Sequence, residues 1–215
     1  MFEAVSGGDI AVKEVVTVGD PASGAELGVA DQIWRWNTSS SSWTKYFYYK
    51  KRTDGPRWVI STDTTVETTD TIPAGETFFF LRASGASTTS LTLAGGVKDL
   101  TGTKSFTVNA DQLAFASNPW PMALNIKDFT SFYTSGEAAS GSEIGVADQI
   151  WLWNTASSSW TKYFYYKKRT DGPRWVISTD ATTETTDTIG VGVGFFFQRA
   201  SGASSATITF SNGNE

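Results

Sequence analysis

Hydrophobic and polar residues alternate over several short stretches of this chain, and a period of two predicts β-strands. Residues 31–37 (DQIWRWN) place Trp34 and Trp36 on one side of such a strand and Ile33 and Arg35 on the other. No long stretch follows the helical period of 3.6 residues. The pattern therefore indicates a protein built mainly of strands.

Three of the predicted strands form a meander. The first is residues 31–37, the small polar stretch 38–42 is its hairpin loop, and residues 43–50 (WTKYFYYK) form the second strand. Because the second strand is aromatic on both faces, we expect it to be covered on both sides. An aspartyl-glycyl pair within residues 51–56 then marks a tight turn into a third strand at residues 57–61.

The remaining elements complete an all-β pattern. Further strands are predicted at residues 78–81, 91–93, 103–109 and 112–116, and short helical turns near residues 9–18 and 125–133. A threonine-rich connection precedes the phenylalanine strand at 78–81. β-Branched and aromatic residues cluster in these runs, as is typical of sheet proteins.

A long internal repeat divides the chain. Residues 28–87 and 145–204, offset by 117 positions, are identical at 51 of 60 positions. Each copy with its flanks has the size of one domain. We therefore predict two tandem, homologous β-sandwich or barrel-like domains, at residues 1–98 and 99–215.

The two copies differ at their edges. The strand-like runs within residues 103–116 precede the second copy and have no counterpart ahead of the first. We expect these runs to pair with either domain or with another subunit, and in each case one domain is short of sheet. An unpaired strand edge can accept a strand from elsewhere.

Composition removes several kinds of functional site. The chain has no histidine and no cysteine, so the commonest general base, the commonest metal ligand and thiol nucleophiles are all missing. No catalytic constellation is visible, and we expect no enzymatic activity and no cofactor. The net charge of −5 gives no general attraction to nucleic acid. No apolar run is long enough to span a membrane.

Tryptophans occupy matching positions in the two copies. They are Trp34, Trp36, Trp43 and Trp58 in the first copy, and Trp151, Trp153, Trp160 and Trp175 in the second. On an exposed strand face they would form a platform for sugar rings, with Asp31, Gln32 and Asn37 as polar neighbours. The other interpretation is that they belong to the core or to an interface, because tryptophan buries a large area.

Charged residues also recur. The basic set is Lys45, Lys50, Lys51, Arg52 and Arg57, repeated as Lys162, Lys167, Lys168, Arg169 and Arg174. It would meet an anionic polysaccharide or an acidic patch on a neighbouring subunit, or it forms a solvated hairpin tip. The threonine-rich segments carry acidic residues, Asp63, Glu67 and Asp70 with Asp180, Glu184 and Asp187. Their spacing matches no defined calcium loop, which favours a solvated acidic loop.

The order of these motifs resembles a repeat found in uncharacterised secreted proteins of environmental and gut bacteria. In those proteins a GDQIYVWD strand is followed by a short loop, a YTTY strand and an AGTGFWF strand. Residues 31–37, 43–46, 73–80 and 193–197 are similar to these elements, and residues 115–121 (FASNPWP) are similar to the segment that opens such a repeat. The resemblance implies an exported, β-rich surface or extracellular protein and assigns no active site.

We therefore expect a structural subunit of an extracellular or cell-surface filament or assembly, joined head to tail to copies of itself through incomplete β-domains and terminal segments. The candidate contact surface comprises Trp34, Arg35, Trp36, Lys50, Lys51, Arg52 and Arg57, with Trp151, Leu152, Trp153, Lys167, Lys168, Arg169 and Arg174. Because Arg35 is replaced by Leu152, we expect this face to meet different neighbours in the two domains. The alternative is a tandem carbohydrate-binding module whose tryptophans bind a polysaccharide.

Overall fold

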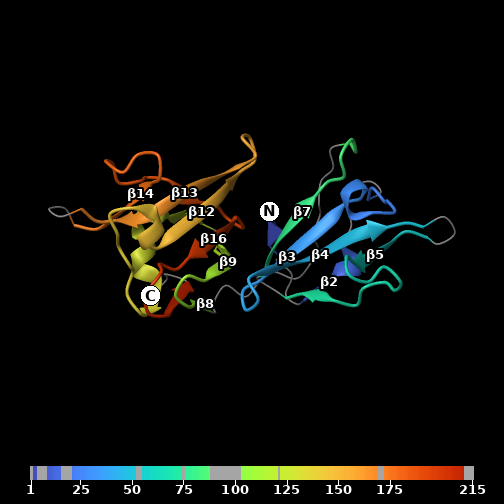
Figure 1. Cartoon of the computed structure of the whole chain (residues 1–215), viewed down its shortest axis with the longest axis horizontal. Coiled ribbons are helices and arrows are strands. Elements are labelled where there is room, and N and C mark those ends of the chain that lie inside the picture. Colours follow the sequence, from blue (N-terminus) through green and yellow to red (C-terminus); the bar gives the residue numbers. More distant parts are fainter. Residues whose placement is uncertain are drawn as a thin grey trace. The chain divides into compact units, whose positions relative to one another are not determined.

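The chain is built of short antiparallel strands joined by turns and 3-10 helices (Figure 1). The structure, a computed structural model, describes residues 2–3, 9–15, 21–51, 55–73, 76–87, 103–120, 122–168 and 172–210. Its contacts divide the chain into two compact units, unit 1 at Met1–Asp99 and unit 2 at Leu100–Glu215. The all-β prediction is confirmed. None of the helices in the described ranges has the length and apolar character needed to cross a membrane.

Unit 1 contains a five-stranded antiparallel sheet in the order β1-β7-β3-β4-β5. Its strands are β1 (Phe2–Glu3), β7 (Thr77–Leu81), β3 (Gln32–Asn37), β4 (Ser42–Tyr49) and β5 (Arg57–Ile60). The predicted meander is therefore present as β3-β4-β5, and β7 returns to pair with the other side of β3. The pairing of β2 (Ile10–Ala11) with β6 (Thr71–Ile72), and the 3-10 helices Val12–Glu14 and Leu27–Val29, complete the unit.

Unit 2 repeats this sheet in the order β14-β13-β12-β16-β9. Its strands are β14 (Arg174–Ile177), β13 (Ser159–Tyr166), β12 (Gln149–Asn154), β16 (Gly194–Gln198) and β9 (Leu113–Ser117). The small pair recurs as β10 (Leu124–Asn125) with β15 (Thr188–Ile189), beside the 3-10 helix η3 (Ile126–Phe132), and the 3-10 helix η4 (Ile144–Val146) contacts β13. A further three-stranded sheet joins β11 (Tyr133–Ser135), β17 (Ala206–Phe210) and β8 (Lys104–Val108).

Both strand-like runs within residues 103–116 lie in unit 2, where β9 pairs with β16 and β8 pairs with β17. The sequence left their partner open. In unit 1, β1 takes the place of β9, since Phe2 pairs with Phe78 as Ala116 pairs with Phe195. The strand predicted at 91–93 and the aspartyl-glycyl turn lie outside the described residues in whole or in part.

Each five-stranded sheet has two different faces. We call the inner face the one that carries Ile33 and Tyr46 in unit 1 and Ile150 and Tyr163 in unit 2. It forms the larger core of each unit. The opposite face is the outer face. β4 contributes to both, with Tyr46 buried in the inner core and Phe47 in a smaller outer core, so the expected cover on both sides is confirmed.

The inner core of unit 2 is filled by aromatic side chains from several elements. Phe129 of η3 is fully buried and stacks on Phe197, with ring centroids 5.7 Å apart. Strand β17, which belongs to the three-stranded sheet, adds Ile208 and Phe210 to the same core. The short helical turn predicted near residues 125–133 is thus present, and it supplies a central core residue.

Candidate functional site

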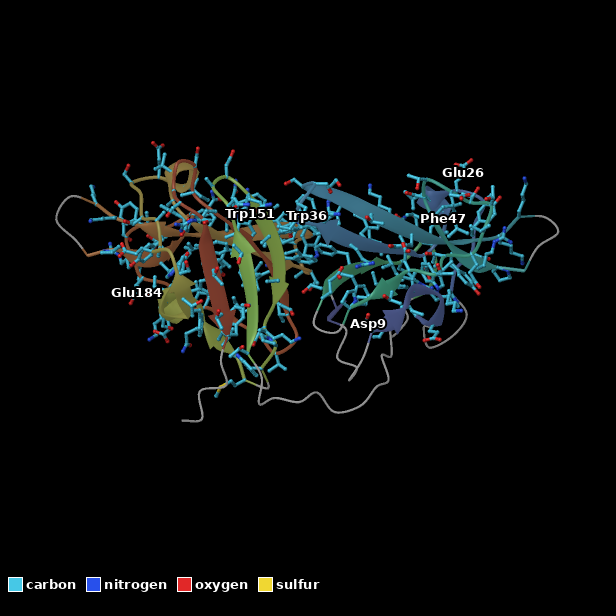
Figure 2. All side chains as sticks on the ribbon, turned by 90° about the horizontal axis from the view of Figure 1, so that it is seen from below. Asp9, Glu26, Trp36, Phe47, Trp151 and Glu184 are labelled. Atoms are coloured by element: carbon cyan, nitrogen blue, oxygen red, sulfur yellow. The ribbon has the colours of Figure 1, made fainter. Side chains whose placement is uncertain are left out.

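The tryptophans at the far end of the β3–β4 hairpin form a half-buried cluster on the outer face of each sheet. In unit 1 this outer aromatic face consists of Trp34, Trp36, Trp43 and Phe79, and in unit 2 of Trp151, Trp153, Trp160, Phe196 and Phe115. Cross-strand register brings them together, because Trp36 lies opposite Trp43 on the neighbouring strand. In Figure 2, Trp36 and Phe47 lie toward opposite ends of the unit 1 sheet.

The rings of this cluster are inclined to one another. Trp36 meets Trp43 at an interplanar angle of 69° with centroids 5.0 Å apart, and Trp34 meets Trp43 at 56°. Unit 2 repeats the arrangement, with an angle of 69° between Trp153 and Trp160. Edge-to-face packing stabilises an aromatic cluster, but it does not lay the rings in one plane.

A lysine lies over one tryptophan in each unit. Lys45 Nζ is 4.0 Å from the ring centroid of Trp34, and Lys162 Nζ is 3.8 Å from that of Trp151. The indole N–H of each tryptophan donates to the side-chain oxygen of Gln32 or Gln149. These cation–π contacts give the outer aromatic face a positive charge at its centre.

Two tryptophans of the predicted platform lie elsewhere. Trp58 and Trp175 are 2% and 0% exposed and belong to the inner cores, so the core interpretation is confirmed for these two and they cannot form part of a platform. The reason is register, since Trp58 lies opposite Tyr48, which faces inward. Its indole N–H donates to the carbonyl oxygen of Val15.

The polar residues expected beside a sugar have structural partners instead. Asp31 is fully buried and accepts hydrogen bonds from the backbone N–H groups of Ala22 and Ala83 and from Arg82. Asn37 accepts a hydrogen bond from the backbone N–H of Ser40 and so closes the hairpin loop. Asp31 is therefore not accessible to a ligand, which removes it from the sugar-platform interpretation.

The basic residues of the prediction spread over the hairpin. Lys50, Lys51, Lys167 and Lys168 are exposed, and Arg52 and Arg169 lie outside the described residues. The guanidinium carbon of Arg57 lies 5.7 Å from the ring centroid of Tyr49, and Arg174 repeats this contact on Tyr166. The same surface of each unit therefore combines tryptophan with positive charge.

The threonine-rich loops carry rigid acidic turns. Asp63 Oδ1 accepts hydrogen bonds from the backbone N–H and the hydroxyl of Thr65, and Asp180 repeats this with Thr182. These bonds lower the pKa of both carboxyl groups below its usual range. Among the described residues, no group of three or more acidic side chains is arranged to hold a metal ion.

An open pocket of about 540 Å³ lies at the hairpin end of the unit 1 sheet. Arg35 forms a bidentate salt bridge with Glu76, at 2.7 and 2.8 Å, on its inner side. Burial lowers the pKa of Arg35, but the hydrogen bond and charge of Glu76 outweigh it and raise that pKa overall. The equivalent pocket of unit 2, about 320 Å³, is lined by Leu152 in place of the arginine.

The exchange of Arg35 for Leu152 is matched within the fold. Glu76 corresponds to Val193 in the second copy, so a salt bridge in unit 1 is replaced by two apolar residues at the matching positions of unit 2. From the sequence, the exchange of Arg35 for Leu152 suggested that the two domains meet different neighbours. In the structure, Arg35 pairs with Glu76 of its own unit.

Sequence reasoning missed two buried polar anchors. Asp148 accepts hydrogen bonds from Tyr133, Arg199 and the backbone N–H of Ala200. Asn118, from the segment similar to the opening of the secreted repeats, donates to the carbonyl oxygens of Met122, Ile189 and Gly190. The aspartate and arginine recur in both copies at a spacing of 51 residues, and that retention is the signal that could have revealed the pair.

Two buried tyrosines should make the protein sensitive to alkaline pH. Burial and a hydrogen bond to Asp70 raise the pKa of Tyr46 to about 12, and Tyr163 with Asp187 shifts in the same direction. Because the pKa is raised in the folded state, this contribution to stability is complete below pH ~10, the unfolded value, and disappears as pH rises through the folded value.

We expect replacement of both tyrosines by phenylalanine to lower the free energy of unfolding at pH 7 by roughly 1–3 kcal/mol for each hydroxyl removed. The variant should lose less stability than the wild type between pH 9 and pH 11, as measured by urea unfolding. Equal alkaline losses in both proteins would contradict the role of these hydroxyls.

The chain matches no protein-family model, no curated protein and no solved structure.

Proposed function

We propose that the protein is a non-enzymatic structural subunit of an extracellular filament or surface assembly, which binds copies of itself through the outer aromatic faces. In this proposal each unit is one β-sandwich-like domain, and the chain is a tandem of two. The extracellular location rests on the resemblance to secreted bacterial repeats. The observation that carries the proposal is the presence of the same half-buried tryptophan cluster on both units.

Tryptophan and cationic residues are typical of the centres of protein–protein interfaces. Each outer face combines three half-buried tryptophans with a lysine ammonium lying on one of them. Two such faces in one chain make it bivalent. A bivalent subunit whose contacts do not close into a ring extends into a filament.

The alternative of a sugar-binding platform has less support from the same geometry. A sugar ring stacks on a flat, open aromatic face, whereas Trp34 and Trp36 are each tilted against Trp43 by 56° and 69°. Lys45 also lies over the ring of Trp34. These contacts favour a protein partner that packs against a shaped, positively charged surface.

Replacing Trp36 and Trp153 together by threonine should abolish self-association while leaving the fold intact. Both side chains are half-buried near the end of a strand, and threonine preserves strand propensity. Because each tryptophan at an interface centre contributes about 2 kcal/mol or more, the concentration needed for assembly should rise by at least about tenfold. Sedimentation velocity over a concentration series and negative-stain microscopy measure this change.

The matched control replaces Val29 and Val146, which are 58% and 50% exposed and equivalent in the two copies, by threonine. This variant should assemble as the wild type does. A wild-type protein that stays monomeric at high concentration and low salt would refute the proposed assembly. Equal assembly of the tryptophan variant and the wild type would show that these faces are not the contact.

A further inference from the structure

The described lysines of the hairpin form no salt bridge. Among the described residues, salt bridges join Arg35, Arg82, Lys127 and Arg199 to carboxylates. None involves the lysines of the second hairpin strand and of the residues that follow it, which are Lys45, Lys50 and Lys51, with Lys162, Lys167 and Lys168. Of these, Lys45 and Lys162 lie on the outer aromatic face, which therefore carries an uncompensated positive charge.

The threonine-rich loops have the opposite property. Asp63 and Glu67 in unit 1, and Asp180 and Glu184 in unit 2, are exposed, and within the described residues no cation pairs with them. The loop is fixed to the sheet, because the backbone N–H of Thr68 donates to the carbonyl oxygen of Trp58. Glu184 lies at the surface of unit 2 (Figure 2).

The lysine and the acidic loop occupy different places on the same unit. Lys45 is on the outer face, opposite Trp34 in the strand pairing. The acidic loop ends at Asp70, whose carboxylate accepts a hydrogen bond from Tyr46 on the inner face. The loop also reaches the outer side, because Arg57, which packs on Tyr49, donates to the carbonyl oxygens of Thr64 and Thr65. The lysine and the loop acids are thus two separate charged surfaces that a second copy can bring together.

We propose that the outer aromatic face of one copy binds the acidic threonine-rich loop of a second copy of this chain. The inference rests on the proposed self-assembly and names the partner surface. The contact is heterologous, since two different surfaces meet, and such contacts propagate unless they close into a ring. Lys45 and Lys162 would pair with Glu67 and Glu184 while the neighbouring tryptophans pack against the threonines.

Both halves of the contact are present in each unit, because Lys45, Asp63 and Glu67 recur as Lys162, Asp180 and Glu184. Complementary charge accelerates association and selects the orientation of the partner, and salt screens it. Assembly should therefore weaken as the salt concentration rises.

The test uses two charge-reversed forms of the full chain. The first carries Lys45→Glu and Lys162→Glu, and the second carries Glu67→Lys and Glu184→Lys. In either form alone the two surfaces have like charges, so the concentration needed for assembly should rise by about tenfold or more. An equimolar mixture should assemble again, because each face then meets a loop of opposite charge on the other form. Sedimentation velocity at low salt measures all three samples.

Because Lys45 is half-buried, replacing it by glutamate could also disturb the packing of the tryptophan cluster, and a second variant controls for this effect. Lys45→Gln with Lys162→Gln removes the charge, keeps part of the aliphatic side chain over the indole ring, and should weaken assembly in the same direction. Recovery in the mixture supports the inference and shows that both forms are folded. If the wild type assembles but the mixture does not recover, or if the reversed forms assemble unchanged, the named contact is wrong and the proposed function stands. A monomeric wild type overturns both.

Discussion

Replacing Asp148 by alanine is expected to lower the free energy of unfolding by about 3–5 kcal/mol. The carboxylate is 0% exposed, and its partner Arg199 is 2% exposed. Asp148 also accepts hydrogen bonds from Tyr133 at 2.7 Å and from the backbone N–H of Ala200 at 2.8 Å. Alanine would leave the buried guanidinium without its counterion, and this uncompensated charge is the main cause of the loss. Urea unfolding followed by tryptophan fluorescence measures it.

Unit 1 supplies the matched control, because Asp31 holds the equivalent position. Its partner Arg82 is 24% exposed, so water can solvate the guanidinium when the carboxylate is removed. We expect Asp31→Ala to cost about 1–3 kcal/mol, less than the change in unit 2. Asp148→Asn retains an acceptor for the backbone N–H groups, so its loss of unfolding free energy should lie between those of Asp148→Ala and Asp31→Ala. Equal losses for both alanine variants would contradict the dependence on burial.

Replacing Phe129 by alanine should cost a similar amount, about 3–5 kcal/mol. The side chain is 0% exposed and lies at the centre of the unit 2 core. Its ring stacks on Phe197 and meets Trp175, Phe195 and Phe210 at centroid distances of 5.8 to 6.1 Å. Alanine would leave a cavity among residues of several elements, which cannot collapse together to fill it. Thermal and urea unfolding measure the loss.

Two further substitutions in this core distinguish the effect of the side-chain volume that is lost from the effect of the place of the residue in the core. Phe132→Ala removes a ring that is only half-buried and contacts Phe129 and Phe210 at the edge of the core, so its cost should be clearly smaller. Phe129→Leu keeps much of the volume and should recover part of the stability. If Phe129→Ala lowers the free energy of unfolding no more than Phe132→Ala does, then Phe129 is not the central core residue inferred here.

Much of the fold could be predicted from the chain alone. The strands of the meander and the helical turn near residues 125–133 were found because their signals lie among neighbouring residues. The alternation in residues 31–37 correctly separated Trp34 and Trp36 from Ile33. The sequence repeat indicated two homologous domains, and the two five-stranded sheets do have the same strand order.

The candidate site was predicted less completely. The sequence left open whether Trp58 belongs to an exposed platform or to the core, and its register with Tyr48 turns it into the inner core. Asp31 was a neighbour of the ligand only in the sugar-platform interpretation, and Arg82, 51 residues later, makes it a buried structural anchor. Both outcomes depend on how segments distant in sequence pair and pack.

The sequence by itself determined the strand pattern, the repeat, the aromatic and basic content of the hairpin, and the absence of histidine and cysteine. These properties depend on residue identity and on short-range periodicity, which the chain carries before it folds. Only the tertiary structure decided that β8 and β9 belong to unit 2. It also showed that Arg35 is paired with Glu76 and that three of the four tryptophans in each copy stay at the surface. Pairing, register and burial depend on contacts between distant segments, and no local pattern contains them.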